Sequence, residues 1–144
     1  MRTTTATPDL AGRLRLVIAR TARRLRQEAG GGLSPTLAAA LATIERHAPL
    51  TPSELAARER VQRPTATRLL ARLEAAELIA RTPDPDDGRS WLASPTDAGS
   101  ALLAELRTRK TAYLARRLET LPPEDRAALE RAAAILEDVL EDPE

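Results

Sequence analysis

Residues 51–99 read TPSELAARERVQRPTATRLLARLEAAELIARTPDPDDGRSWLASPTDAG, and this stretch decides the fold. It opens with Thr51, Pro52 and Glu54, which form a capping box with a proline at the first helical position. That combination is an N-terminal helix signature, so a short helix is expected at about 52–59.

A second helix is expected to follow a turn at residues 61–64 and to run to about Glu77. Apolar residues recur along one side of it at helical spacing, and they are Ala66, Leu69, Leu70 and Leu73. Arg68 and Arg72 lie four residues apart on another face. The order of short helix, turn and Arg-bearing helix is typical of a helix-turn-helix.

The residues after this helix pair predict a β-hairpin. Residues 78–82 alternate as a strand does, residues 83–88 are dense in turn formers, and residues 89–93 are expected to form the return strand. A hairpin directly after a helix pair is the wing of a winged helix-turn-helix.

Helices are also expected on both sides of this stretch, over 9–29, 35–47, about 96–118 and from Pro122 onward. Apolar residues make up 42% of the chain but aromatic residues only 1%, and a core of Leu, Ala, Val and Ile packs best between helices. The expected fold class is therefore mainly α with a small β-hairpin wing.

Several function classes lack the residues they need. With no Cys and a single His, the chain offers no disulfide, no thiol nucleophile and no metal cluster. It shows no phosphate-binding loop and no nucleophile–base pair, so we expect neither an enzyme nor a cofactor. No signal peptide and no apolar run of membrane-spanning length is visible, and a cytoplasmic protein without a membrane partner is expected.

Charge is distributed unevenly although the net charge is only +1. Residues 1–29 carry seven Arg against two acids, and residues 121–144 carry two Arg against eight acids. Such opposite segments suit mutual packing, although individual surface pairs are weak, so apolar stripes must supply most of that association.

The candidate DNA-binding residues lie on the second helix and the wing. The helix contributes side chains that suit phosphate and base contacts, namely Arg63, Thr65, Thr67, Arg68 and Arg72. At the wing, Arg89 is placed to reach an adjacent minor groove, and Arg81 is an alternative for the same contact. Asp87 and Arg81 are interpreted as residues that orient the wing. The simpler readings are a solvated Arg face, helix-capping Thr residues and ordinary loop charges.

At these residues the sequence resembles the MarR family of bacterial regulators. The family pattern is a helix with Glu-Leu-Ala, a recognition helix ending in Arg-Leu-Glu, a Leu-Ile-x-Arg strand, an Asp-x-Arg wing and a Thr-x-x-Gly helix start. In this chain the pattern corresponds to residues 54–56, 72–74, 78–81, 87–89 and 96–99. No single motif is specific, but their order and spacing together are.

The resemblance implies a homodimer that binds double-stranded palindromic operator DNA, usually as a repressor released by a small phenolic or lipophilic ligand. It divides the chain into an N-terminal dimerisation helix and linker (1–33), a winged-helix lobe (34–95) and C-terminal dimerisation helices (96–144). The chain departs from the pattern at three places. Glu77 stands where Gly is common, which predicts a less tight turn; Pro95 replaces a Leu; and Gln62-Arg63-Pro64 opens the recognition helix, which leaves fewer side chains for base reading.

A second hypothesis is a winged-helix module that binds protein partners without an operator. Its support is the balanced charge of residues 51–95, which carry seven Arg and seven acids. Strong salt dependence of DNA binding is expected only under the first hypothesis.

Overall fold

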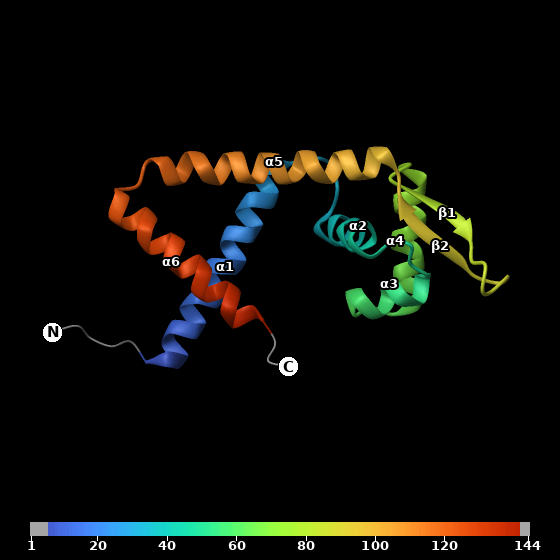
Figure 1. The fold of residues 1–144 in the computed structure, drawn as a ribbon, viewed down its shortest axis with the longest axis horizontal. Coiled ribbons are helices and arrows are strands. Elements are labelled where there is room, and N and C mark those ends of the chain that lie inside the picture. The colour runs from blue at the N-terminus through green and yellow to red at the C-terminus, as the bar shows by residue number, and fades with distance from the viewer. Residues whose placement is uncertain (1–5, 142–144) are drawn as a thin grey trace. The chain divides into compact units, whose positions relative to one another are not determined.

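A computed structural model describes residues 6–141 of the chain. Within that range the chain forms six helices and one two-stranded sheet (Figure 1). In chain order the elements are α1 (Thr7–Ala29), α2 (Pro35–His47), α3 (Pro52–Glu59), α4 (Arg63–Ala75), β1 (Ile79–Pro83), β2 (Trp91–Pro95), α5 (Asp97–Glu119) and α6 (Pro123–Leu140). The predicted class, mainly α with a β-hairpin, is confirmed.

Two compact units divide the chain, Met1–Lys110 and Thr111–Glu144. The boundary between them falls inside α5. The first unit holds α1 to α4, the hairpin and the first part of α5, and the second holds the rest of α5 and α6. Among the described residues, no helix combines the length and the apolar content needed to cross a membrane.

The predicted starts of α2 and α3 are confirmed, and the second differs in the detail of its cap. The Ser34 hydroxyl accepts a hydrogen bond from the Leu37 amide at 3.2 Å, and the Thr51 hydroxyl accepts one from the Glu54 amide at 3.2 Å. In a complete capping box the Glu54 carboxylate would accept from the Thr51 amide. Here it accepts from the Thr51 hydroxyl instead, at 3.1 Å, so the cap is made by side-chain oxygens.

The hairpin pairs its strands in antiparallel register, with Arg81 opposite Ala93 and Pro83 opposite Trp91. Both strands lie one or two residues later than the sequence predicted, because pairing starts at Ile79 opposite Pro95. At the middle of β2, Leu50 and Ala93 exchange two backbone hydrogen bonds, of 3.1 and 2.7 Å. The hairpin is therefore held to the segment between α2 and α3.

The core of the first unit lies between α2, α3, α4 and the hairpin, and Leu103 of α5 joins it. Its largest fully buried side chains are Leu41, Ile44, Leu50, Leu55, Leu70 and Leu73. Trp91 is half-buried and packs against this cluster. The apolar stripe of α4, predicted from its periodicity, supplies four of the buried residues.

The connection between α4 and β1 is a tight turn, so the expectation of a looser junction at Glu77 is wrong. Helix α4 ends at Ala75, and Glu77 adopts a left-handed conformation with φ of 61°. The Leu78 amide donates to the Leu73 carbonyl at 3.0 Å and the Glu77 amide to the Glu74 carbonyl at 2.9 Å. These two bonds form a Schellman motif, in which Glu77 takes the conformation that glycine usually adopts.

The start of α5 packs tightly against the same turn. The Thr96 hydroxyl donates to the Glu77 carbonyl at 2.7 Å and accepts from the Gly99 amide at 3.1 Å. A Cβ on Gly99 would lie 2.1 Å from the Leu78 carbonyl oxygen. Only glycine fits there, which explains the Thr-x-x-Gly pattern physically.

Candidate nucleic-acid interface

Helices α3 and α4 are joined by a turn that begins at Arg60. Arg60 has φ of 54°, and the Val61 amide donates to the Ala56 carbonyl at 3.0 Å, which ends α3 in a second Schellman motif. Gln62 is the N-cap of α4, so Arg63 is its first residue. The sequence placed Arg63 and Pro64 in the turn, and the structure corrects this. Proline is favoured in the first turn of a helix because its missing amide has no partner to lose there.

The outward face of α4 carries the predicted side chains. Arg63, Thr67, Arg68 and Arg72 are exposed, and Thr65 is half-buried. Arg68 and Arg72 therefore point away from the core, as side chains that read a groove must. Residues 62–73 contain no acidic side chain, so the exposed charged side chains of α4 before Glu74 are all basic.

Two local hydrogen bonds arrange this face. The Arg68 guanidinium donates to the Thr65 hydroxyl at 3.4 Å, and the Thr67 hydroxyl donates to the Arg63 carbonyl one turn earlier at 3.0 Å. Arg63, Pro64, Thr67 and Arg68 also line an open depression of about 400 Å³. The leading end of α4 is thus a basic surface with two hydroxyl groups beside its cations.

The wing loop, residues 84–90, is held by its own turns. The Asp84 carboxylate accepts from the Asp86 amide at 2.9 Å, and the Asp87 carboxylate accepts from the Arg89 amide at 3.0 Å. Asp87 therefore contacts the backbone of Arg89, and any effect on the guanidinium is exerted through the loop. The Arg89 side chain is exposed.

Arg81 lies on β1 and contacts two side chains, Glu74 and Trp91, that the sequence analysis did not pair with it. Its Nε donates to the Glu74 carboxylate of α4 at 2.6 Å. Its guanidinium carbon lies 3.9 Å from the ring centroid of Trp91 on β2. Because Arg81 pairs with Ala93, Trp91 is its diagonal neighbour on the same face of the hairpin. Only the strand register, which the sequence left open, reveals this contact.

The comparisons with known proteins agree on one family. The model of the MarR family matches residues 33–91. An uncharacterized HTH-type transcriptional regulator from Mycobacterium bovis is 36% identical over 128 residues, which cover 88% of this chain and 90% of that protein. The chain belongs to the MarR family.

Two further MarR-family comparisons extend this result. The HTH-type transcriptional repressor MdtR of Bacillus subtilis is 35% identical over 94 residues, which cover 65% of this chain and 61% of MdtR. A crystal structure of a Pseudomonas aeruginosa protein assigned as a transcriptional regulator superposes with a TM-score of 0.85 at 31% identity, covering 98% of this chain and 100% of that one. This MarR-family chain is a DNA-binding transcriptional regulator with a winged helix-turn-helix fold.

Proposed function

We propose that the protein is a repressor that binds palindromic operator DNA as a homodimer and leaves it when a small anionic ligand binds. The observation that carries the DNA-binding part is the exposed face of α4, where Arg63, Arg68 and Arg72 project with no acid between residues 62 and 73. We assign this activity to the cytoplasm, where a regulator meets the chromosome, and we propose no enzymatic role.

In this proposal α4 enters the major groove, and its leading end reads base edges. We assign Arg68, which lies between Arg63 and Arg72 along the helix, to a guanine, whose O6 and N7 a guanidinium contacts together. Arg63 and Arg72 flank it and contact phosphates, while Thr65 and Thr67 offer hydroxyl contacts beside them. Thr65 also steadies the Arg68 guanidinium through the 3.4 Å contact.

The wing would reach the neighbouring minor groove. Arg89 is exposed on a loop whose backbone is fixed by Asp84 and Asp87. Narrow minor grooves attract guanidinium groups through their enhanced negative potential. The Asp87 carboxylate accepts a hydrogen bond from the Arg89 amide, and this bond holds the shape of the loop.

Homodimerisation is supported by apolar side chains that one chain leaves exposed. In α1 these include Leu10, Leu16, Val17 and Ile18, and in α6 they include Leu129, Ile135, Val139 and Leu140. In the part of α6 that the structure describes, no residue is buried. The basic character of α1 and the acidic character of α6 favour a second copy of this chain as the partner, since each helix would meet its opposite charge.

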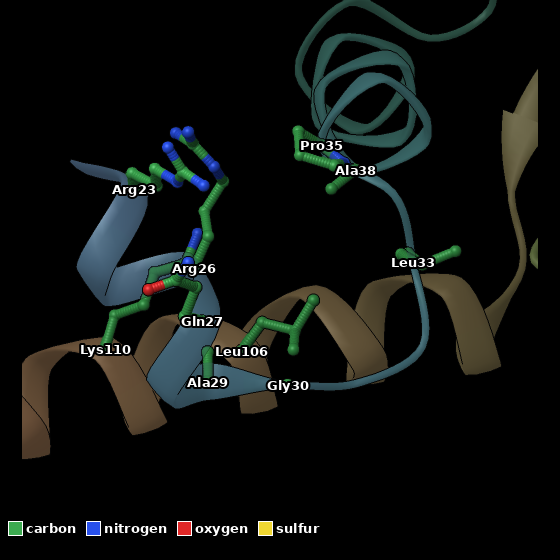
Figure 2. A pocket seen from close by; sticks show the side chains of 10 residues that line it. All are labelled: Arg23, Arg26, Gln27, Ala29, Gly30, Leu33, Pro35, Ala38, Leu106 and Lys110. Carbon is green, nitrogen blue, oxygen red and sulfur yellow. The ribbon is translucent and has the colours of Figure 1, made fainter. Parts of the chain in front are cut away.

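Ligand response is supported by a pocket of about 330 Å³ within the first unit. It is lined by residues from the end of α1, the following linker, the start of α2 and α5 (Figure 2). Leu33, Pro35 and Leu106 are among its apolar lining residues, and its charged side chains are Arg23, Arg26 and Lys110 with no carboxylate. Apolar lining residues and a cationic rim suit a small aromatic or aliphatic carboxylate as the ligand. This proposal is more specific than the phenolic or lipophilic ligand that the sequence resemblance implies.

Repression rather than activation is supported by MdtR, the relative whose name states that it is a repressor. A ligand in this pocket would contact α1, α2 and α5 together, and α2 packs against the helix-turn-helix. Such a ligand can shift the DNA-binding equilibrium only by its differential affinity for the two arrangements of the lobe.

The test of DNA binding is selection of genomic DNA fragments by the protein, followed by footprinting and salt titration of the selected site. Arg68→Ala should weaken binding by about 1–3 kcal/mol and relax the preference at one base pair. Arg89→Ala should weaken binding more uniformly across sequences, while Arg116→Ala, an exposed charge-matched control on α5, should bind like the parent. Parental binding by both Arg68→Ala and Arg89→Ala, or no footprint for the parent, would refute the proposal in favour of a protein-interaction module.

The test of the pocket is calorimetric titration with benzoate as a probe of the carboxylate class. Arg26→Ala and Lys110→Ala should each weaken benzoate binding, and benzoate should lower operator affinity. Arg107→Ala removes a cation of the same α5 helix that does not line the pocket, and it should bind benzoate like the parent. Equal benzoate affinity in all variants would show that the pocket is not the ligand site.

A further inference from the structure

We infer that Arg81 is a positioning residue that fixes the wing relative to the recognition helix, by pairing with Glu74 and stacking on Trp91. This inference rests on the proposed function, because the distance between α4 and the wing matters only when both meet one duplex. Arg81 is thereby assigned a role distinct from that of Arg89, although both are wing cations.

The three side chains come from three elements, α4, β1 and β2, and the guanidinium of Arg81 contacts both of the others. Its Nε donates to the Glu74 carboxylate at 2.6 Å, and its guanidinium carbon lies over the Trp91 ring, 3.9 Å from the centroid. Arginine suits this place because it makes a directional hydrogen bond with its edge and a cation–π contact with its face. A lysine provides the charge but not this planar double contact.

We call the contacts of Arg81 with Glu74 and Trp91 the clamp. Its position along the hairpin determines which part of the wing it orients. On the side away from the loop, Ile79 is buried, and Ala93, the residue paired with Arg81, is buried and bonded to Leu50. Beyond it, the residues from Thr82 to Arg89 are exposed apart from the half-buried Asp84, and the loop contacts are internal to the loop. Within residues 6–141, the Arg81–Glu74 pair is thus a polar link from α4 to the part of the hairpin that leads into the loop carrying Arg89.

The clamp fixes the orientation of the outer hairpin more than it stabilises the fold. The side chains of Arg81 and Glu74 are 47% and 39% exposed, and solvent screens such a pair so that it adds little to the free energy of folding. Its hydrogen bond still selects one orientation of the outer hairpin against α4. Preorganised geometry of this kind raises affinity by reducing what must be ordered on binding.

Removal of the Glu74 charge separates two explanations by the direction in which DNA affinity changes. A carboxylate at the end of a DNA-reading helix repels phosphates, so electrostatics alone predicts that Glu74→Gln tightens DNA binding. If Glu74 holds Arg81, the same substitution instead loosens the wing and weakens binding. The two explanations therefore differ in the direction of the effect.

The experiment combines a measurement on the free protein with one on DNA. Trp91 is the only tryptophan of the chain, so its quenching by iodide and acrylamide reports the wing directly. Arg81→Ala, Arg81→Lys and Glu74→Gln should each raise the quenching of Trp91. On the operator fragment selected with the parent, each should lower affinity about three- to tenfold and reduce the footprint at the wing-side flank.

Arg107→Ala is the matched control. It also removes an exposed Arg–Glu pair, with Glu45 at 2.9 Å, and one positive charge, but it does not touch the wing. It should leave Trp91 quenching and the wing-side footprint unchanged. In an Arg81→Ala background, Glu74→Gln should cause no further loss, because the pair is already broken.

Two results would overturn the inference. The first is unchanged Trp91 quenching in Arg81→Ala, and the second is equal or tighter DNA binding by Glu74→Gln in the otherwise parental chain. A parent without any footprint would refute the proposed function itself, and the role of Arg81 on DNA would fall with it. Failure of the clamp alone would instead leave the parental footprint and the Arg68 effect intact.

Discussion

The winged-helix region buries its apolar side chains, whereas the outer helices α1 and α6 leave most of theirs exposed. In α2, α3 and α4, each helix buries at least three residues, and Leu41, Ile44, Leu70 and Leu73 are almost fully enclosed. In α1 only Ala29 is buried, and the described part of α6 buries none. Burial of apolar area is the main favourable term in folding and in association alike.

This difference indicates where each region obtains its stability. The winged-helix region covers its own core, so its geometry is set within one chain. The outer helices keep amphipathic stripes that a single chain does not cover, and large exposed apolar patches mark interaction sites. We therefore expect substitutions in the first region to change folding and substitutions in the second to change assembly.

The largest expected effect comes from one chemical change made in each region. Ile44 is fully buried, whereas Ile135 is 52% exposed. Ile44→Ala should lower the free energy of unfolding by about 2–5 kcal/mol, because it leaves a cavity in the core. Ile135→Ala should leave folding of the monomer almost unchanged and raise the dissociation constant of the dimer. Urea denaturation and analytical ultracentrifugation over a range of protein concentrations measure the two effects.

Protein concentration separates the two regions in this experiment. Dimerisation stabilises by mass action, so the loss in Ile135→Ala should depend on concentration. A loss of the same size at every concentration would mean that Ile135 packs within its own chain, and the distinction between the regions would fail.

The next effect concerns two glycines, one in each region. A Cβ on Gly99 would meet the Leu78 carbonyl oxygen at 2.1 Å, whereas one on Gly12 in α1 would have no neighbour within 4 Å. Gly99→Ala should cost about 1–3 kcal/mol, since backbone must shift at the junction of hairpin and α5. Gly12→Ala should stabilise by about 0.5–1 kcal/mol through higher helix propensity. Thermal and urea denaturation measure both, and a neutral Gly99→Ala would show that this junction is loose.

Features that depend on neighbouring residues were predictable from the sequence. The starts of α2 and α3 follow from Ser34, Thr51 and the prolines after them, because caps act within one helical turn. The outward direction of Arg68 and Arg72 follows from the periodicity of the apolar stripe between them. The contacts of these side chains with DNA remain predictions.

Features that depend on register or on a single backbone angle were not predictable. The Arg81–Trp91 contact requires the pairing of Arg81 with Ala93, which the seven-residue loop from 84 to 90 does not fix by its composition. The start of α4 at Arg63 was missed because proline signals both a turn and the first turn of a helix. The tight turn at Glu77 was missed because its residue type argues against it.

The smallest expected effect comes from a substitution in the turn at Glu77. There the winged-helix region depends on a backbone conformation and not on burial of apolar side chains. Glu77 is exposed and holds φ of 61°, a conformation that costs about 1–2 kcal/mol for a residue with a Cβ and almost nothing for glycine. Glu77→Gly should therefore stabilise by about 0.5–1 kcal/mol after the larger chain entropy of glycine is subtracted. The control is Ala76→Gly, one residue earlier at φ of −82°, which should destabilise by about 0.5–1 kcal/mol. Urea denaturation of the two variants should give shifts of opposite sign. Destabilisation by both would mean that the left-handed turn is not present in solution, and the rigid link from α4 to the wing would lose its physical basis.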